Sequence, residues 1–375
     1  MEQLFSLRIS CLCGSVSQSV PSRPAVDTPP NLSLCHCNTC RYSTGLLCAS
    51  YYPIAPPSVP SSITQYEGGD GWTRHFCSSC GCHVFRCKAA GAQEVEWELA
   101  TGVIIESLNS DGSPEVTNYT HHKQVSDTKD GGIAVWIQDF LGTKMELLES
   151  EVPSVSPRAS LDDDHLPASC DCGRVSFHIT RPNPRSHFPR SNIADLIYPY
   201  CLTDKAITQN PGNEKWWIRA DGTKYLGGTC ACRSCRLASG FEIQTWAFVP
   251  RSNIFFHIAG PDSKETVVPL DFDALPAGTL TSYRSSLGVL REFCGSCGAT
   301  VFWHDKWRPD LIDVSVGLFR ASDGARAEGW IDWWTERVSF TEEVENGRSG
   351  SEARRARALI ASLEEGLRRW GSRGQ

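Results

Sequence analysis

The sequence predicts a mainly β protein that consists of two tandem domains of antiparallel sheets and ends in a C-terminal α-helix. Three observations lead to this prediction. A length of 375 residues suggests two domains of ordinary size. Clusters of cysteine occur twice in the same order, and several segments alternate apolar with polar residues at the two-residue period of a β-strand. Helical spacing is convincing only near the C-terminus.

The strand prediction rests on three segments in which apolar residues alternate with smaller or polar ones. These residues are Val95, Trp97 and Leu99; Val175, Phe177 and Ile179; and Ile312, Val314 and Val316. Each pattern indicates a half-buried strand with one polar face.

The helix prediction rests on an apolar stripe beside several arginines. The stripe consists of Leu359, Ile360, Leu363, Leu367 and Trp370. We expect this helix to pack on the body of the protein or on a partner. Its basic face is typical of a solvated surface more than of a membrane or nucleic-acid contact.

The cysteines form an internal repeat. Of the 18 cysteines, fourteen lie in six clusters, and each half contains C-x-C-G, then C-x-C-x-x-C, then C-x-x-C-G. Matching residues follow the middle cluster, because Cys40-Arg41 with Gly45 corresponds to Cys235-Arg236 with Gly240. We therefore expect a first domain at 1–150, a linker rich in Pro, Ser and Asp at 151–165, a second domain at 166–340 and a helical tail at 341–375.

The second half carries insertions between the matching clusters. The segment between the first and second clusters spans 14–34 in the first half and 173–229 in the second. The longer segment is rich in large aromatic residues: Phe177, Phe188, Tyr198, Tyr200, Trp216, Trp217 and Tyr225. Such residues are more often core than pocket lining, so the role of this insertion stays open.

Composition and charge exclude several classes of protein. Hydrophobic residues at 40% and charged residues at 21% are typical of a globular protein. A net charge of −7 and a pI near 5.8 argue against a nonspecific binder of nucleic acid or anionic membranes, since such surfaces need a basic field. With no apolar run typical of a secretory signal or membrane span, we expect a reducing, cytoplasmic location, where close-spaced thiols bind metal.

Seven clustered cysteines per half divide into four and three. A structural Zn²⁺ takes four ligands, whereas a catalytic one usually keeps three and an open position. The glycines that end the outer clusters allow tight turns that direct two sulfurs at one ion. We therefore assign one structural zinc to Cys11, Cys13, Cys77 and Cys80, and another to Cys170, Cys172, Cys294 and Cys297.

The middle clusters offer three sulfurs each and leave a fourth metal position open. They consist of Cys35, Cys37 and Cys40, and of Cys230, Cys232 and Cys235. Zinc held by three thiolates is a weak Lewis acid, but it accepts one more thiolate and keeps that thiol deprotonated. A thiol bound in this way attacks a carbonyl, or leaves when an adduct breaks. Arg41 and Arg236 can offset the negative charge or hold a substrate carboxylate, with ordinary surface ion pairing as an equal alternative.

Other interpretations of the three-cysteine clusters remain open. Each can be a structural site whose fourth ligand comes from elsewhere, and the first half offers His36, His75, His83, His121, His122 and Cys48. A redox C-x-x-C is less favoured, because no βαβ pattern surrounds the clusters. Ala231 stands where the first half has His36, so this histidine is not an obligatory base in both halves.

Both halves resemble the glutathione-dependent formaldehyde-activating enzyme family, which also includes centromere protein V-like domains. The resemblance is carried by C-x-C-G, C-[HA]-C-x-x-C-R-x-x-[ST]-G and F-C-x-x-C-G, in this order and twice, over about 5–140 and 166–340. The arrangement is similar to fungal-type two-domain members. The resemblance implies a zinc-stapled "β-tent" fold, with the outer cysteines on a structural zinc and the middle three on a catalytic zinc. It also implies a carbon–sulfur lyase reaction that joins glutathione to formaldehyde or reverses that step.

Three hypotheses about function follow. The leading one is an enzyme with four zinc ions per chain that adds glutathione or another thiol to a small carbonyl, or cleaves such an adduct. The second is a non-catalytic, zinc-stabilised protein-interaction module, and the third is a zinc enzyme that acts on a larger biosynthetic intermediate. We expect small-molecule partners, a possible homodimer, and no nucleic acid or membrane.

Overall fold

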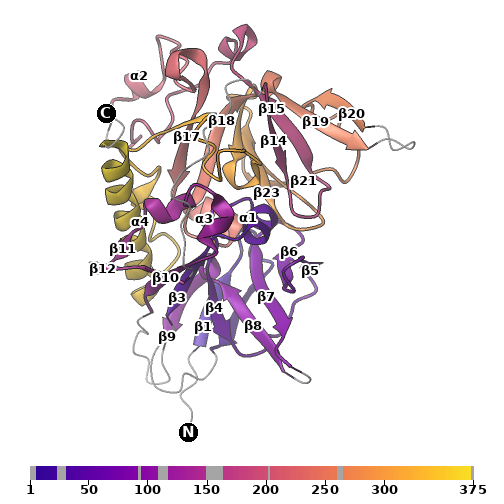
Figure 1. The fold of residues 1–375 in the computed structure, drawn as a ribbon, viewed down its shortest axis with the longest axis vertical. Helices are drawn as coiled ribbons and strands as arrows, with labels where there is room; N and C mark the ends of the chain where they lie inside the picture. The colour runs from indigo at the N-terminus through magenta and orange to yellow at the C-terminus, as the bar shows by residue number, and fades with distance from the viewer. Residues whose placement is uncertain are drawn as a thin grey trace.

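The computed structural model of the chain describes residues 6–22, 31–91, 94–108, 117–148, 164–201, 203–259 and 265–372. These residues form a mainly β protein of several antiparallel sheets with a C-terminal helix, which confirms the predicted fold class. We call residues 6–148 the first repeat and residues 164–344 the second repeat. Figure 1 shows the first repeat in the lower half of the view and the second in the upper half. Apart from residues 164 and 165, the predicted linker lies outside the described residues.

The first repeat is built mainly from short antiparallel strands. Its elements are β1 (Ser6–Ser10), β2 (Ser17–Pro21), β3 (Leu32–Cys35), α1 (Asn38–Thr44), β4 (Tyr51–Ile54), β5 (Ile63–Glu67), β6 (Thr73–Cys77), β7 (His83–Ala89), β8 (Val95–Ala100), β9 (Ile104–Leu108), β10 (Tyr119–Lys123), β11 (Asp139–Phe140), β12 (Thr143–Lys144) and β13 (Glu146–Leu147). The largest sheet has the order β4-β8-β7-β6-β5, and a smaller sheet has the order β2-β1-β9. β10 pairs in parallel with both β3 and β13, an exception to the antiparallel pattern.

The second repeat contains the same central arrangement with additions. Its elements are β14 (His165–Ser169), β15 (Ser176–Thr180), α2 (Lys205–Thr208), β16 (Ile218–Arg219), β17 (Lys224–Cys230), α3 (Arg233–Ser239), β18 (Gln244–Pro250), β19 (Ile254–Ala259), β20 (Glu265–Pro269), β21 (Thr281–Ser286), β22 (Val289–Phe293), β23 (Thr300–Asp305), β24 (Leu311–Ser315) and β25 (Ile331–Trp333). The run β18-β24-β23-β22-β21 corresponds to β4-β8-β7-β6-β5 of the first repeat. Inserted strands β19 and β20 extend the sheet that β14 and β15 begin, and β25 pairs in parallel with β17.

The three predicted strands exist, but their burial differs from the prediction. β8 buries Leu99 and leaves Val95 51% exposed, so the alternating pattern does not place all three apolar residues inside. β15 buries Phe177 and Ile179 as predicted, but His178 between them is also buried. β24 is buried along its whole length, so a polar outer face was a wrong expectation there. The reason is its central position between β18 and β23, where both faces of the sheet are covered.

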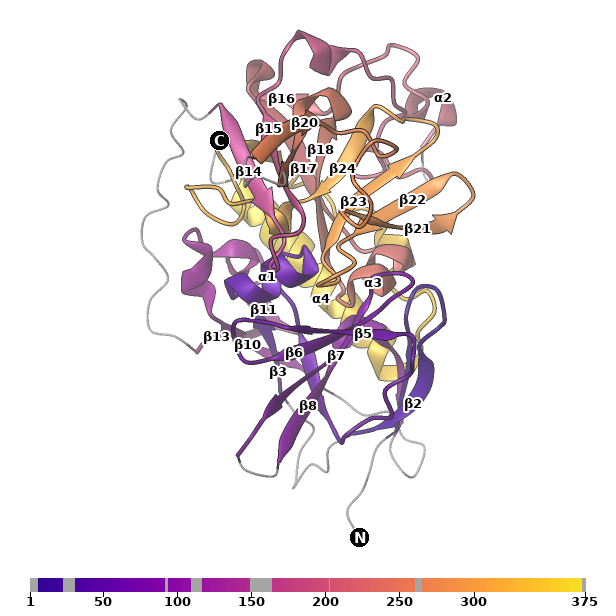
Figure 2. The ribbon, with the colours of Figure 1, turned by 90° about the vertical axis from the view of Figure 1, so that its right-hand side faces the viewer.

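Helices α1 and α3 end in the same way and lie at the contact between the repeats (Figures 1 and 2). Each is followed by a glycine in the left-handed region, Gly45 at φ 78° and Gly240 at φ 85°. A Cβ on Gly45 would lie 2.1 Å from the carbonyl oxygen of Thr300, and one on Gly240 would lie 2.3 Å from that of His83. Because these are equivalent positions in the two repeats, the contact has approximate twofold symmetry.

The same exchange of partners occurs around the cysteine turns. The amide of Leu12 donates to the carbonyl of Leu237 in α3 at 3.2 Å, and that of Asp171 donates to the carbonyl of Tyr42 in α1 at 3.0 Å. One hydrophobic core runs through both repeats and includes the cysteines Cys77 and Cys294. The two repeats therefore pack as a single unit.

The C-terminal helix α4 (Gly350–Gly371) spans both repeats and covers the side of the molecule, as Figure 1 shows. Its predicted stripe is buried against the same chain, with Leu359, Leu363 and Leu367 at 0% exposure. Gly366 sits so close to the backbone of Trp136 that a Cβ there would lie 1.5 Å from the carbonyl oxygen. The apolar face is thus occupied within the chain. Among the described residues, no helix has both the length and the apolarity that crossing a membrane requires.

Candidate functional site

The four outer cysteines of each repeat converge on one point. Cys11 and Cys13 follow β1, whereas Cys77 ends β6 and Cys80 lies in the turn before β7, and their sulfurs all lie within 4.8 Å of one another. The Sγ atoms of Cys13 and Cys77 are 3.5 Å apart. Four sulfurs about 2.3 Å from a tetrahedral zinc lie roughly 3.8 Å from each other, so this group fits the metal. The cysteines are free, because a disulfide would require about 2.05 Å.

The second repeat forms the same group from segments farther apart in sequence. Cys170 and Cys172 follow β14, and Cys294 and Cys297 lie between β22 and β23. The Sγ atoms of Cys172 and Cys294 are 3.5 Å apart. The amide of Val175 lies 3.3 Å from the sulfur of Cys170, which favours a thiolate at that position.

The three middle cysteines of each repeat join a strand end to a helix start. In the first three-cysteine group, Cys35 ends β3, Cys37 is the N-cap of α1, and Cys40 lies in its first turn. Cys230, Cys232 and Cys235 occupy the same places at β17 and α3, and form the second three-cysteine group. In both groups the cap sulfur accepts a hydrogen bond at 3.3 Å from the amide of the last cysteine. The C-x-C-x-x-C spacing therefore directs three sulfurs to one side of a helix N-terminus.

None of the candidate fourth ligands joins the first three-cysteine group. Within the described part of the chain, no histidine, carboxylate or further cysteine lies within 4.8 Å of all three sulfurs. His36 and His122 instead contact each other at 2.9 Å between ring nitrogens. Burial lowers the pKa of His36 well below its ordinary value and lowers that of His122 to about 4, so this pair is neutral. Among the described residues, each group thus offers three protein sulfurs and no fourth protein ligand.

Guanidinium groups lie beside the last cysteine of each group. The Nη2 atom of Arg74 is 3.5 Å from the Sγ atom of Cys40, and Nη2 of Arg291 is 3.5 Å from that of Cys235. Hydrogen bonds from Cys35 and Cys37, followed by the Arg74 and Arg86 charges, hold the pKa of Cys40 well below its ordinary value.

Cys235 is stabilised in the same way. Its pKa is lowered by hydrogen bonds from Cys230 and Cys232 and then by the charge of Arg291. One thiol of each group is therefore stabilised as a thiolate.

The structure does not place Arg41 or Arg236 against these sulfurs. Arg236 donates to the carbonyl oxygens of Gly102 at 2.5 Å and Asn346 at 2.9 Å, and Arg41 donates to the side chain of Asn38 at 3.3 Å. Both side chains are buried, with Arg41 at 2% and Arg236 at 0% exposure. Arg74 and Arg291 take the expected role. Their common position, three residues before the F-C-x-x-C-G cysteine, was the available sequence clue.

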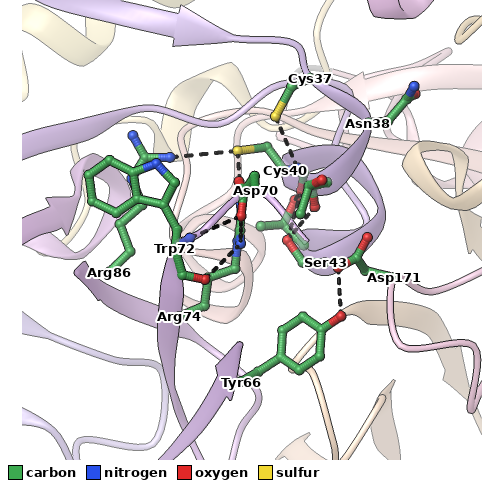
Figure 3. A network of polar contacts seen from close by, with 12 residues as sticks. Cys37, Asn38, Cys40, Ser43, Tyr66, Asp70, Trp72, Arg74, Arg86 and Asp171 are labelled. Atoms are coloured by element: carbon green, nitrogen blue, oxygen red, sulfur yellow. Dashed lines mark hydrogen bonds and ion pairs between the residues drawn. The ribbon is translucent and has the colours of Figure 1, made fainter. Parts of the chain in front are cut away.

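Side chains of the first repeat lie close to the sulfur of Cys40 (Figure 3). The Arg86 guanidinium lies between two rings, 3.8 Å from the centroid of Tyr51 and 4.1 Å from that of Trp72. It also forms an ion pair with Glu98 at 2.5 Å and lies 3.7 Å from the sulfur of Cys40. These contacts hold Arg86 next to the last cysteine of the first group.

A cavity of about 740 Å³ opens on the second three-cysteine group. All three cysteines line it, together with Trp246 and Trp303, which stand where the first repeat has Tyr51 and Arg86. The long insertion supplies another wall with Asp195, Leu196, Asn210 and two of its aromatic residues, Tyr200 and Trp216. Trp217 is buried core with 0% exposure, so the insertion serves both purposes.

Comparison with known proteins supports this architecture. No curated protein matches the chain significantly. The family model described as glutathione-dependent formaldehyde-activating enzyme matches residues 6–122 and 217–337. The second match begins after Cys170 and Cys172, so the place of these two residues in a four-cysteine group rests on the geometry. Since the two matches together cover more than half of the chain, the protein belongs to the glutathione-dependent formaldehyde-activating enzyme family and contains the family unit twice.

Proposed function

We propose that the protein is a zinc-dependent enzyme of the carbon–sulfur lyase type. It adds a thiol such as glutathione to a small carbonyl, or cleaves such an adduct, at the second three-cysteine group. The observation that carries the proposal is the 740 Å³ cavity whose wall contains Cys230, Cys232 and Cys235. A volume in this range suits a ligand of glutathione size. The family description supports glutathione and formaldehyde as the substrate pair.

The four cysteine groups have separate roles in this proposal. The outer groups hold structural zinc and fasten the turns of each repeat. The second three-cysteine group would hold a zinc ion, which supplies a position where a fourth sulfur stays deprotonated at neutral pH. Arg291 lies against Cys235 and offsets part of the negative charge that three thiolates concentrate there.

The cavity walls position the reactants. Trp246 is 5% exposed and Trp303 packs against the same cluster of cysteines, so both rings give the cavity an apolar wall next to the sulfurs. Addition forms one bond between the thiol sulfur and the carbonyl carbon, while the thiol proton ends on the carbonyl oxygen. Cleavage breaks that bond and returns the proton to the sulfur, so no external oxidant or reductant is required.

A carbonyl larger than formaldehyde is a second candidate substrate. Formaldehyde has two heavy atoms and fills a small part of the cavity, whereas the insertion adds Tyr200, Asn210 and Trp216 to the wall. The same chemistry then applies to an aldehyde or adduct that contacts these side chains.

The test is a magnetisation-exchange NMR experiment with ¹³C-formaldehyde and glutathione. We expect the protein to accelerate exchange between free formaldehyde and its S-hydroxymethyl adduct, and metal analysis to give one zinc for each of the four cysteine groups. Larger aldehydes in the same experiment test the second candidate. A zinc-loaded protein that leaves every exchange rate at the value of the buffer would refute the proposal.

A further inference from the structure

The two three-cysteine sites differ at equivalent positions around a shared arginine. Segments 67–73 and 284–290 have equal length and connect Tyr66 to Arg74 and Tyr283 to Arg291. In both repeats the tyrosine and the arginine are paired across the β-hairpin. Arg74 and Arg291 are therefore equivalent, and so are Asp70 and Leu287.

In the first repeat, the arginine is neutralised by a carboxylate from its own hairpin. Asp70 receives hydrogen bonds from Nη1 of Arg74 at 2.9 Å and from Nη2 at 2.6 Å, as Figure 3 shows. Such a two-point contact is the geometry in which a guanidinium binds a carboxylate ligand. Asp70 thus occupies the place that a ligand carboxylate would take.

In the second repeat, this carboxylate is missing. Leu287 stands in its place and is 77% exposed. Arg291 is only 3% exposed, and its Nη2 donates to Ser234 at 2.8 Å. Its Nε and Nη1 atoms have no hydrogen-bond partner, although the residue lines the cavity. Leaving such buried donors without a partner is unfavourable, so a ligand that supplies an acceptor binds more tightly.

Among the described residues, four carboxylates line the cavity, and each has a partner other than Arg291. Asp195 accepts from Arg337 at 2.9 Å and from the amide of Phe340 at 2.7 Å. Asp313 forms an ion pair with Arg308 at 2.7 Å. Asp305 accepts from the amides of Trp307 and Arg308, both at 2.8 Å, and Glu343 from the amide of Arg233 at 3.3 Å. None of these contacts uses the Nε or Nη1 atom of Arg291.

A second arginine also lies against the sulfur of Cys40 in the first repeat. Arg86 lies 3.7 Å from that sulfur and packs on the ring of Trp72, whereas Trp303 and Val289 stand at these positions in the second repeat and line the cavity. We propose that Arg291 binds a carboxylate of the thiol substrate in the second repeat, and that Asp70 and Arg86 close the first repeat to the same ligand. This inference rests on the proposed function for the thiol, and adds that the thiol is an acid and that only one site takes it.

The test compares two small thiols that differ in one group, 3-mercaptopropionate and 2-mercaptoethanol, by titration calorimetry on the zinc-loaded full chain. We expect one 3-mercaptopropionate per chain, bound at least about tenfold more tightly than 2-mercaptoethanol, since a charge-assisted hydrogen bond supplies such a factor. Two bound molecules per chain, or equal affinities for the two thiols, would overturn the inference.

Matched variants locate the effect. Arg291→Gln removes the charge in the open site, and Arg74→Gln makes the same change in the closed one. The preference for the carboxylate should fall about tenfold in R291Q and persist in R74Q. An equal loss in both variants would overturn the assignment. If R291Q does not fold, the thiol comparison and the stoichiometry still decide the question, because they need only the unaltered protein.

The inference and the proposed function fail separately. Carboxylate preference with one site per chain, but without acceleration of formaldehyde exchange, would reject the function and keep the inference. Accelerated exchange with equal affinity for both thiols would reject the inference alone.

Discussion

Substituting Cys232 by serine should abolish the reaction and leave the fold intact. Cys232 is the N-cap of α3, and its sulfur accepts the amide of Cys235 at 3.3 Å. Serine is among the preferred N-cap residues and keeps this acceptor, whereas alanine loses it at a cost of about 1 kcal/mol. C232S therefore removes one metal ligand and retains the cap, and C232A removes both.

Loss of the N-cap should change the melting temperature only slightly in a chain of this length. Unfolding entropy scales with residue number, so about 1 kcal/mol shifts the Tm of the 375-residue chain by roughly 1 °C. We expect C232A to melt about that much below C232S. Both variants should lose the zinc of one cysteine group.

The assay is the exchange between formaldehyde and its glutathione adduct, with metal content and Tm measured on the same samples. Cys37→Ser is the matched control, because Cys37 caps α1 in the same way in the closed site. C232S should abolish the acceleration while C37S keeps most of it. Full activity in C232S would refute the role of the second three-cysteine group, and global unfolding of C232S would make that group structural.

The remaining predictions concern the outer cysteines, a buried carboxyl and the C-terminal helix. Cys297→Ser should unfold the second repeat, because structural zinc contributes about 10–16 kcal/mol and net stabilities are about 5–15 kcal/mol; retained circular dichroism and Tm would contradict this. Burial raises the pKa of Asp313 to about 6, so its charged form destabilises the fold above that pH and the penalty disappears as pH falls through it. The stability advantage of Asp313→Asn over the unaltered chain should therefore shrink by about 1 kcal/mol between about pH 7.5 and 5.5 in urea titrations, and an advantage that grows would refute the assignment. Gly366→Ala should cost about 2 kcal/mol in the same titrations, because its Cβ would meet the Trp136 carbonyl, whereas Ala361→Ser on the exposed face should change little; equal effects would show that α4 does not pack tightly.

The cysteine spacing predicted the grouping because ligands of one site are close in sequence or sit in recognisable turns. C-x-C-G and C-x-x-C-G each direct two sulfurs to one side, and their order in both halves identified the pairs that meet. The strands were predicted where one apolar face alternates with a polar one. β24 departs from this pattern because both of its faces are buried. Burial of the second face depends on the strands beside it in the sheet, and the two-residue pattern within one segment contains no information about them.

The charged surroundings of the sulfurs were less accessible to sequence reasoning. Arg41 and Arg236 follow the third cysteine directly, but their guanidinium groups bond to Asn38 and to the carbonyl of Gly102 instead of to the sulfurs. Arg74 and Arg291 reach the sulfurs from strands β6 and β22, a contact made across the fold. The cavity likewise depends on how residues of the insertion pack over the second repeat. This packing cannot be predicted from the sequence pattern of the insertion alone.

The exchange of partners at Gly45 and Gly240 is the geometry of a symmetric dimer built into one polypeptide. In a true homodimer every substitution occurs in both subunits, so a change that closes one site closes the other. Joining the subunits in one chain removes this constraint. Arg86 can lie against Cys40 in one half while Trp303 lines a cavity in the other, so the two sites are free to take different forms.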